Sequence, residues 1–137
     1  MAVIDGRTGL EQLSRSVCLE LLGECEVGRI GVVVDGAPEI YPVNFVVEDG
    51  HILFRTARGA KLRGIDKSPS VCFEVDGIDR DRRTGWSVLV KGRAEVISDA
   101  PTARQQAESR LRYWAPGQKV SWISIQPREI TGRRILR

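Results

Sequence analysis

The sequence predicts a mainly β fold, a β-barrel with flanking helices, and three observations lead to it. Short runs rich in β-branched residues recur along most of the 137 residues. Turn dipeptides such as Asp35-Gly36 and Asp49-Gly50 separate these runs, as in successive hairpins. Two or three stretches with helical periodicity flank them. Strands at short intervals with glycine-rich turns favour a closed, mostly antiparallel barrel of six or seven strands.

The first half of the chain should hold a helix, a three-stranded meander and a second helix. Apolar residues recur at helical spacing from Leu10 to Leu22. Thr8 with Glu11 three residues later resembles a capping box, so the first helix should begin there. Pro42 cannot donate to a ladder and indicates an edge strand or an irregularity. The expected elements are a helix over 8–23, strands over 27–34, 40–47 and 51–56, and a short helix over 59–67.

The second half should hold the remaining strands and one more helix. The segment 76–85 is polar and rich in arginine, so it should be a loop. Gly92 should mark a bulge in a long strand. Pro101 suits the first turn of a helix, and Pro127 should divide the last strand in two. The expected elements are strands over 70–75 and 86–97, a helix over 100–114, and strands over 119–125 and 129–136.

Length and charge limit the classes of function. The length fits one domain over residues 1–137. The formal net charge is +3, but the basic residues are scattered along the chain, so we expect no nucleic-acid partner. No apolar run is long enough to span a membrane, so we expect no membrane partner. Because no secretory signal is visible either, we expect a cytoplasmic protein.

None of the familiar catalytic or metal-binding sets is present in the sequence. The single histidine, His51, and three scattered cysteines have no spacing that suits zinc. There is no Gly-x-Ser-x-Gly elbow, dinucleotide-binding glycine motif or phosphate-binding Walker loop. We therefore expect no catalytic side chain and no metal. If the chain is an enzyme, its chemistry should come from a cofactor.

The segment 54–62 has the residue types of a phosphate site. Arg55 and Thr56 stand at the end of an expected strand, and Lys61 lies in the first turn of the short helix. Arginine offers a planar fork of donors, lysine a point charge and threonine a hydroxyl. Gly59 permits close approach, and a helix N-terminus adds oriented amides. The alternative is a solvated basic loop.

Two further segments have residues that suit a flat ring. Asn44, which follows Pro42 and Val43, can both donate and accept hydrogen bonds, although a bulged edge strand would explain the same residues. Trp86, with Ser87 beside it, opens a long strand after a polar loop. It could cover an aromatic ligand or a partner subunit, or it could simply close the end of the barrel.

Together these segments resemble the pyridoxamine 5′-phosphate oxidase-like family, the FMN-binding split barrels. The resemblance runs from about Leu19 to Ile135, and the order and spacing of its motifs make it specific. The motifs are Val27-Gly28-Arg29-Ile30, Pro42-Val43-Asn44-Phe45, Phe54-Arg55-Thr56 with Gly59 and Lys61, and the stretch 85–94.

The resemblance implies a six-stranded antiparallel split barrel that forms a homodimer with FMN in a groove at the interface. The expected activity is hydride transfer through the flavin to a small-molecule substrate. The resemblance assigns the cofactor phosphate to Arg55, Thr56 and Lys61, the strand lining the isoalloxazine ring to Pro42, Val43 and Asn44, and the contribution of the neighbouring subunit to Trp86 and Ser87.

The C-terminal tail departs from the vitamin B6 oxidases of this family. Residues 130–137 lack the histidine of their substrate motif, so oxidation of pyridoxamine phosphate itself is not expected. Arg58, Arg63 and Lys67 would suit the longer anionic tail of a deazaflavin coenzyme, so a reductase that uses that coenzyme is an alternative. A carrier or sensor that holds a flavin or a tetrapyrrole without turnover is another.

Overall fold

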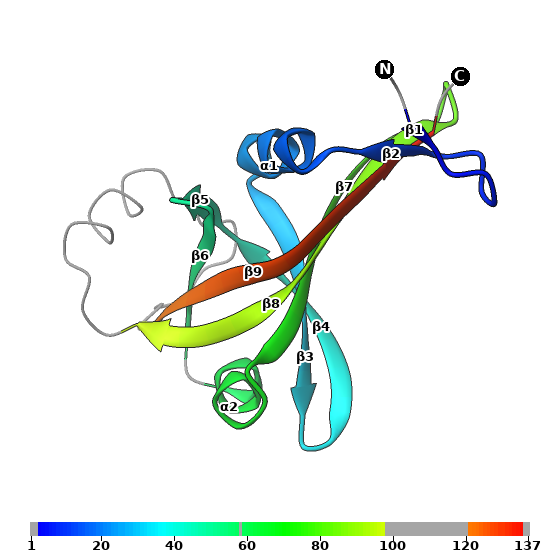
Figure 1. The fold of residues 1–137 in the computed structure, drawn as a ribbon. Coiled ribbons are helices and arrows are strands. Elements are labelled where there is room, and N and C mark those ends of the chain that lie inside the picture. Colours follow the sequence, from blue (N-terminus) through cyan, green and yellow to red (C-terminus); the bar gives the residue numbers. More distant parts are fainter. Residues whose placement is uncertain (1–2, 58, 98–120, 136–137) are drawn as a thin grey trace.

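The structure, a computed structural model, describes residues 3–57, 59–97 and 121–135. It confirms a mainly β antiparallel fold with two helices in the described part (Figure 1). The helix expected over 100–114 lies outside the described residues. The elements are β1 (Val3–Ile4), β2 (Glu11–Leu13), α1 (Arg15–Glu24), β3 (Val27–Val34), β4 (Ala37–Asn44), β5 (Val46–Glu48), β6 (His51–Thr56), α2 (Ala60–Lys67), β7 (Ser70–Asp79), β8 (Thr84–Ile97) and β9 (Ser121–Arg134).

Six strands make the barrel: β3, β4, β6, β7, β8 and β9. The barrel is closed because the chain runs from β4, which pairs with β3, into β5, which pairs with β6. Strands β3, β7, β8 and β9 follow one another as neighbours, and β6 pairs with the other side of β9. Strand β4 pairs with β3, and after Phe45 the chain continues as β5, which pairs with β6. The chain therefore changes partners at Phe45, close to the irregularity that Pro42 indicates. The expected strand over 40–47 is two strands for this reason.

The barrel interior is filled by side chains that alternate along each strand. On β3, Ile30 and Val32 are buried whereas Arg29 and Val33 face outward, as the two-residue period of a strand requires. The largest fully buried side chains include Phe54, Phe73, Leu22, Ile30, Ile52, Ile65, Ile123 and Ile125.

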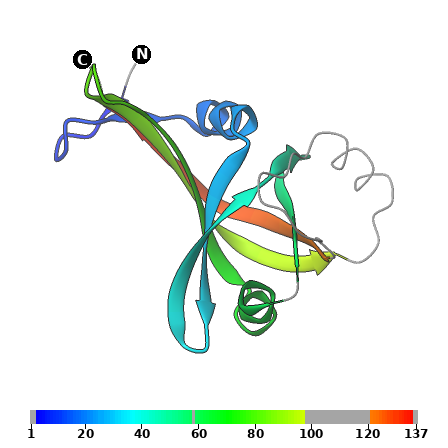
Figure 2. The ribbon, with the colours of Figure 1, turned by 180° about the vertical axis from the view of Figure 1, so that it is seen from behind.

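An arm extends from the barrel where β7, β8 and β9 run on together (Figures 1 and 2). The segment 76–85 is therefore part of a hairpin rather than the expected loop. Asp79 pairs with Thr84, and only residues 80–83 form the turn. The expectation was wrong because polar residues can form a solvent-facing strand when a neighbouring strand supplies the backbone hydrogen bonds.

Strand β9 is continuous and not divided at Pro127. Its register against β8 shifts between Lys91 and Gly92, and Pro127 lies opposite Gly92. Proline has no backbone N–H to donate to the ladder, and the bulge accommodates this without ending the strand. The bulge expected at Gly92 is confirmed, and the expected break is wrong.

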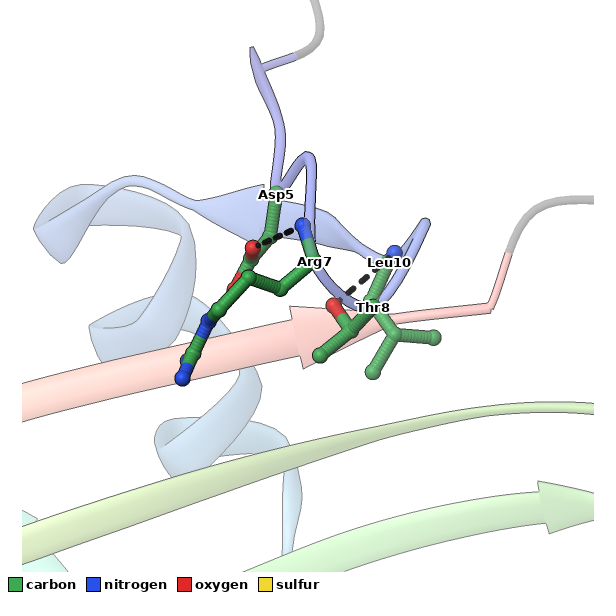
Figure 3. A network of polar contacts seen from close by, with 4 residues as sticks. All are labelled: Asp5, Arg7, Thr8 and Leu10. Atoms are coloured by element: carbon green, nitrogen blue, oxygen red, sulfur yellow. Dashed lines mark hydrogen bonds and ion pairs between the residues drawn. The ribbon is translucent and has the colours of Figure 1, made fainter.

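The N-terminal strands β1 and β2 are joined by a tight turn (Figure 3). Asp5 Oδ1 accepts a hydrogen bond from the Arg7 amide at 2.8 Å, and Thr8 Oγ1 accepts one from the Leu10 amide at 3.3 Å. The Asp5 amide donates to the Leu10 carbonyl at 2.8 Å. Thr8 therefore stabilises a turn and caps no helix.

Helix α1 begins at Arg15, seven residues after the expected start. The Ser14 hydroxyl accepts a hydrogen bond from the Val17 amide at 3.3 Å and is the N-cap. The preceding residues 11–13 pair with the end of β9 as β2. This long-range pairing overrides the local helical pattern. No helix in the described part of the chain has the length and apolar character to cross a membrane.

Candidate functional site

The proposed phosphate site lies where β6 ends and α2 begins, and we call Arg55, Thr56, Gly59 and Lys61 the anion cradle. Arg55 is the β6 residue opposite Trp122 on β9, and its Cζ lies 5.4 Å from the centre of that indole ring. Trp122 is buried, so it gives the guanidinium a fixed surface to stack on. Thr56 is also buried, and its hydroxyl donates to the Ala57 carbonyl at 3.3 Å.

The backbone at Gly59 shapes the start of α2. Its φ of 157° and ψ of −164° belong to a region that only glycine adopts readily. A Cβ atom built there would meet no atom of the described residues within 4 Å. Among the described residues no side chain caps α2, and its first turn carries no acidic residue. Its N-terminal amides and positive dipole end therefore favour an anion.

Lys61 reaches the cradle from the first turn of α2. Its Nζ lies 5.4 Å from the centre of the Tyr41 ring on β4 and 6.0 Å from that of Phe54 on β6. These distances are within the range of cation–π attraction. Lys61 therefore connects α2 with strands β4 and β6.

The strand expected to line a flat ring borders this cradle. Pro42 directly follows Tyr41, which contacts Lys61, so the end of β4 and the start of α2 are brought together. Val43 is buried, and Asn44 is the last residue of β4, opposite Val27. Two of the three predicted segments, 42–44 and 54–62, thus lie together in a single chain.

Trp86 and Ser87 do not join this region. Trp86 pairs with Arg134 on β9, whereas Arg55 pairs with Trp122 at the other end of the same 14-residue strand. At about 3.3 Å per residue, the length of β9 between Trp122 and Arg134 is at most roughly 40 Å. Figures 1 and 2 show the arm directed away from α2. A ligand that touches both ends needs more than one copy of the chain.

A groove of about 640 Å³ surrounds Trp86 on the arm. Sequence reasoning missed the rest of this groove because its walls come from distant segments: the expected helix 8–23, the expected loop 76–85, and the expected strands 70–75 and 129–136. Trp86 and the arginines were the available signals, but only the strand pairing brings them together. The residues that build the walls include Leu10, Glu74, Asp76, Ile78, Arg133 and Ile135.

A carboxyl pair lies in the wall of this groove. Glu74 and Asp76 are two residues apart on β7, and Arg29 Nη1 lies 3.7 Å from Glu74 Oε1 and 3.5 Å from Asp76 Oδ2. Burial, with a hydrogen bond and repulsion from Asp76, raises the pKa of Glu74 from 4.5 to about 7. Arg29 acts against this shift without cancelling it.

Glu74→Gln should flatten the pH dependence of stability. Because the pKa of Glu74 is higher in the folded than in the unfolded protein, the folded state holds an extra proton between about pH 4.5 and 7. The free energy of unfolding should therefore fall as the pH rises through that window, and it should fall less in the variant. Thermal unfolding measured from pH 4 to 8 tests this.

The matched control is Glu129→Gln. Glu129 is an exposed carboxylate, 3.8 Å from Lys91 Nζ, so the same substitution there leaves the carboxyl pair untouched. Equal pH slopes in Glu74→Gln and in the unmodified protein would contradict the assignment.

Comparison with known proteins identifies a family for most of the chain. A family model described as pyridoxamine 5′-phosphate oxidase matches residues 14–134. An uncharacterised protein of Mycobacterium tuberculosis is 34% identical over 130 residues, which cover 91% of this chain and 85% of that protein.

Two solved structures are similar along nearly the whole chain. A FAD-binding protein of Mesorhizobium loti has a TM-score of 0.83 at 27% identity, covering 93% of this chain and 99% of that one. The FAD-binding protein of Mycobacterium smegmatis has a TM-score of 0.68 at 35% identity, with the same coverage.

Proposed function

The chain belongs to the pyridoxamine 5′-phosphate oxidase family, and on this premise we propose that it binds a flavin nucleotide and acts as an oxidoreductase. The observation that carries the proposal is the anion cradle, in which Arg55 stacks on Trp122 at the end of β6 and Lys61 lies over Tyr41 from the first turn of α2, two residues after Gly59. When bound, the flavin supplies the hydride chemistry that no set of side chains here supplies.

Each residue of the cradle has a defined part in holding the phosphate. Arg55, stacked on Trp122, can present two parallel donors to phosphate oxygens. Lys61 adds a point charge, and the first amides of α2 add oriented donors. The Thr56 hydroxyl, which donates to the Ala57 carbonyl in this structure, would turn to donate to the phosphate.

The isoalloxazine ring would then lie along the end of β4. The backbone there changes partner at Phe45, whose amide donates to the Glu26 carbonyl at 3.1 Å. Pro42 supplies an exposed apolar surface, the backbone of Val43, whose side chain is buried, lines the ring, and Asn44 supplies hydrogen-bonding groups for the polar edge of the ring.

FMN is the flavin we propose, because the cradle provides for one terminal phosphate. FAD is the second candidate, and the two similar FAD-binding proteins of Mesorhizobium loti and Mycobacterium smegmatis favour it. Arg63 and Lys67 follow Lys61 on α2 and offer cations to a longer anionic cofactor, FAD or a deazaflavin coenzyme.

The purified protein should be yellow, or should become so when flavin is added. Heating and chromatography of the released cofactor identify it, and titration of the apoprotein with FMN, FAD and a deazaflavin coenzyme ranks the three. Tighter binding of FAD or of the deazaflavin coenzyme would replace FMN as the cofactor. Binding of none of them at neutral pH would overturn the proposed function.

We also propose that the working unit is a homodimer with the flavin at the interface. The support is the separation of the cradle from Trp86 along β9 in one chain, at most roughly 40 Å. In a dimer, Trp86 and Ser87 on the arm of one subunit would cover the flavin held by its partner. The groove around Trp86 would then take the small-molecule substrate.

Mixing two defective variants should restore binding if the site is shared. Arg55→Ala damages the cradle, and Trp86→Ala damages the arm. After unfolding and refolding of the mixture, a mixed dimer would contain one site with both residues intact and one site with neither. Recovered tight flavin binding, at about one site per mixed dimer, supports the shared site. No recovery in a mixture shown to contain mixed dimers would contradict it.

A further inference from the structure

One aromatic side chain beside the anion cradle, Tyr41, has no part in the cofactor assignment above. The Tyr41 ring lies on β4 beneath the Lys61 ammonium, with 5.4 Å between Nζ and the ring centre. Phe54, which is fully buried in the barrel, lies 6.0 Å from the same nitrogen. Two rings fixed to two different strands therefore face one flexible cation.

We propose that Tyr41 is a positioning residue that holds the Lys61 ammonium in the anion cradle for the cofactor phosphate. This inference rests on the proposed flavin site. A lysine side chain has four rotatable carbon bonds and loses considerable rotamer entropy when it is fixed. Attraction to a ring that is already in place limits this cost at the moment when the phosphate binds.

The surroundings of Tyr41 keep its ring in position and neutral. Its hydroxyl donates a hydrogen bond to Glu39 Oε2, two residues earlier and on the same face of β4. This hydrogen bond and the carboxylate charge raise the pKa of Tyr41, whereas Arg63 on α2 acts in the opposite direction. The phenol therefore stays protonated at neutral pH, and it is the ring face that attracts Lys61.

Lys61 also lies beside the two strand ends that the cofactor assignment uses. Tyr41 immediately precedes Pro42, the first residue of the strand end proposed to line the flavin, and Phe54 immediately precedes Arg55. The two rings that contact Lys61 thus belong to the same strand ends as the residues assigned to the ring and the phosphate of the cofactor. Lys61, which lies over these two rings, is therefore close to the strand ends assigned to the ring and to the phosphate of the cofactor.

The test compares Tyr41→Leu with Tyr41→Phe in flavin titrations, using FMN, or FAD if that is the bound flavin. Tyr41→Leu removes the ring and should weaken binding by about two- to fivefold, the size of a cation–π contact at a partly exposed site. Tyr41→Phe keeps the ring and should bind within about twofold of the unmodified protein. Thermal unfolding of both variants shows whether they remain folded.

Coupling to Lys61 separates positioning from a general structural effect. In a Lys61→Met background, Tyr41→Leu should cause no further loss, because the cation that it positions is absent. An equal loss in both backgrounds, or unchanged affinity in Tyr41→Leu, would overturn the inference while the flavin site stands. Failure of the unmodified protein to bind any flavin would overturn the proposed function, and this inference with it.

Discussion

Replacing Arg55 by alanine should weaken flavin binding by about 1.5–3 kcal/mol, roughly ten- to 150-fold in the dissociation constant. The expected loss is large because the guanidinium is the one group in the cradle that can bind two phosphate oxygens at once. Its stacking on the buried Trp122 ring, 5.4 Å away, fixes this orientation before the ligand arrives. Quenching of flavin fluorescence during titration of the apoprotein measures the constant.

Two controls make this result specific. Arg93→Ala removes the same charge from an exposed position on β8 and should leave the affinity nearly unchanged. Arg55→Lys keeps the charge but loses the planar fork, so its affinity should fall between those of the alanine variant and the unmodified protein. Because Arg55→Ala also loses the contact with Trp122, its unfolding curve must be measured. A folded Arg55→Ala variant with unchanged affinity would contradict the phosphate assignment.

The hairpins were predictable from the sequence because their information is local. At Asp35-Gly36 and Asp49-Gly50 all four residues have positive φ, between 49° and 80°, as the tight primed turns of hairpins require. Asp-Gly is among the few pairs that adopt this conformation at low cost. Strands β3 and β6 therefore have the expected ends, whereas β4 begins three residues earlier than expected.

The structure of the N-terminal segment could not be predicted from its local sequence. Residues 8–13 have an acceptable helical pattern, but Glu11–Leu13 pairs with the last residues of β9, more than a hundred positions later. Nothing near Thr8 indicates that partner. The backbone hydrogen bonds formed by this strand pairing stabilise the segment more than its helix propensity does, which is only about a few tenths of a kcal/mol per residue.

The anion cradle and the groove around Trp86 also differ in how far the local sequence predicts them. The anion cradle comes from one continuous stretch, 54–62, so its residue types could be identified together. The contacts that fix it, from Trp122 and Tyr41, come from other strands and carry no signal in the sequence. The groove around Trp86 is built from three distant segments. Only the register of β7, β8 and β9 shows that they meet.

Gly64→Ala should destabilise the fold by about 1–3 kcal/mol, although alanine is the better helix former. Gly64 lies in α2 where the helix packs against β3. A Cβ atom there would lie 2.7 Å from the Val33 carbonyl oxygen and 2.9 Å from Val34 Cγ2. The Val33 backbone is part of the β3–β4 pairing and cannot move away cheaply. The helix must shift instead, which carries Lys61 with it and should lower flavin affinity as well.

Gly23→Ala is the matched control, because Gly23 lies in α1 and a Cβ atom there would meet no described atom within 4 Å. The same substitution should stabilise the protein at that position by up to about 1 kcal/mol, through helix propensity alone. Urea denaturation of the two variants should therefore give changes of opposite sign. A gain in stability for both would show that α2 is not seated on β3 as closely as the 2.7 Å approach requires, and the position of Lys61 in the cradle would then lose its structural support.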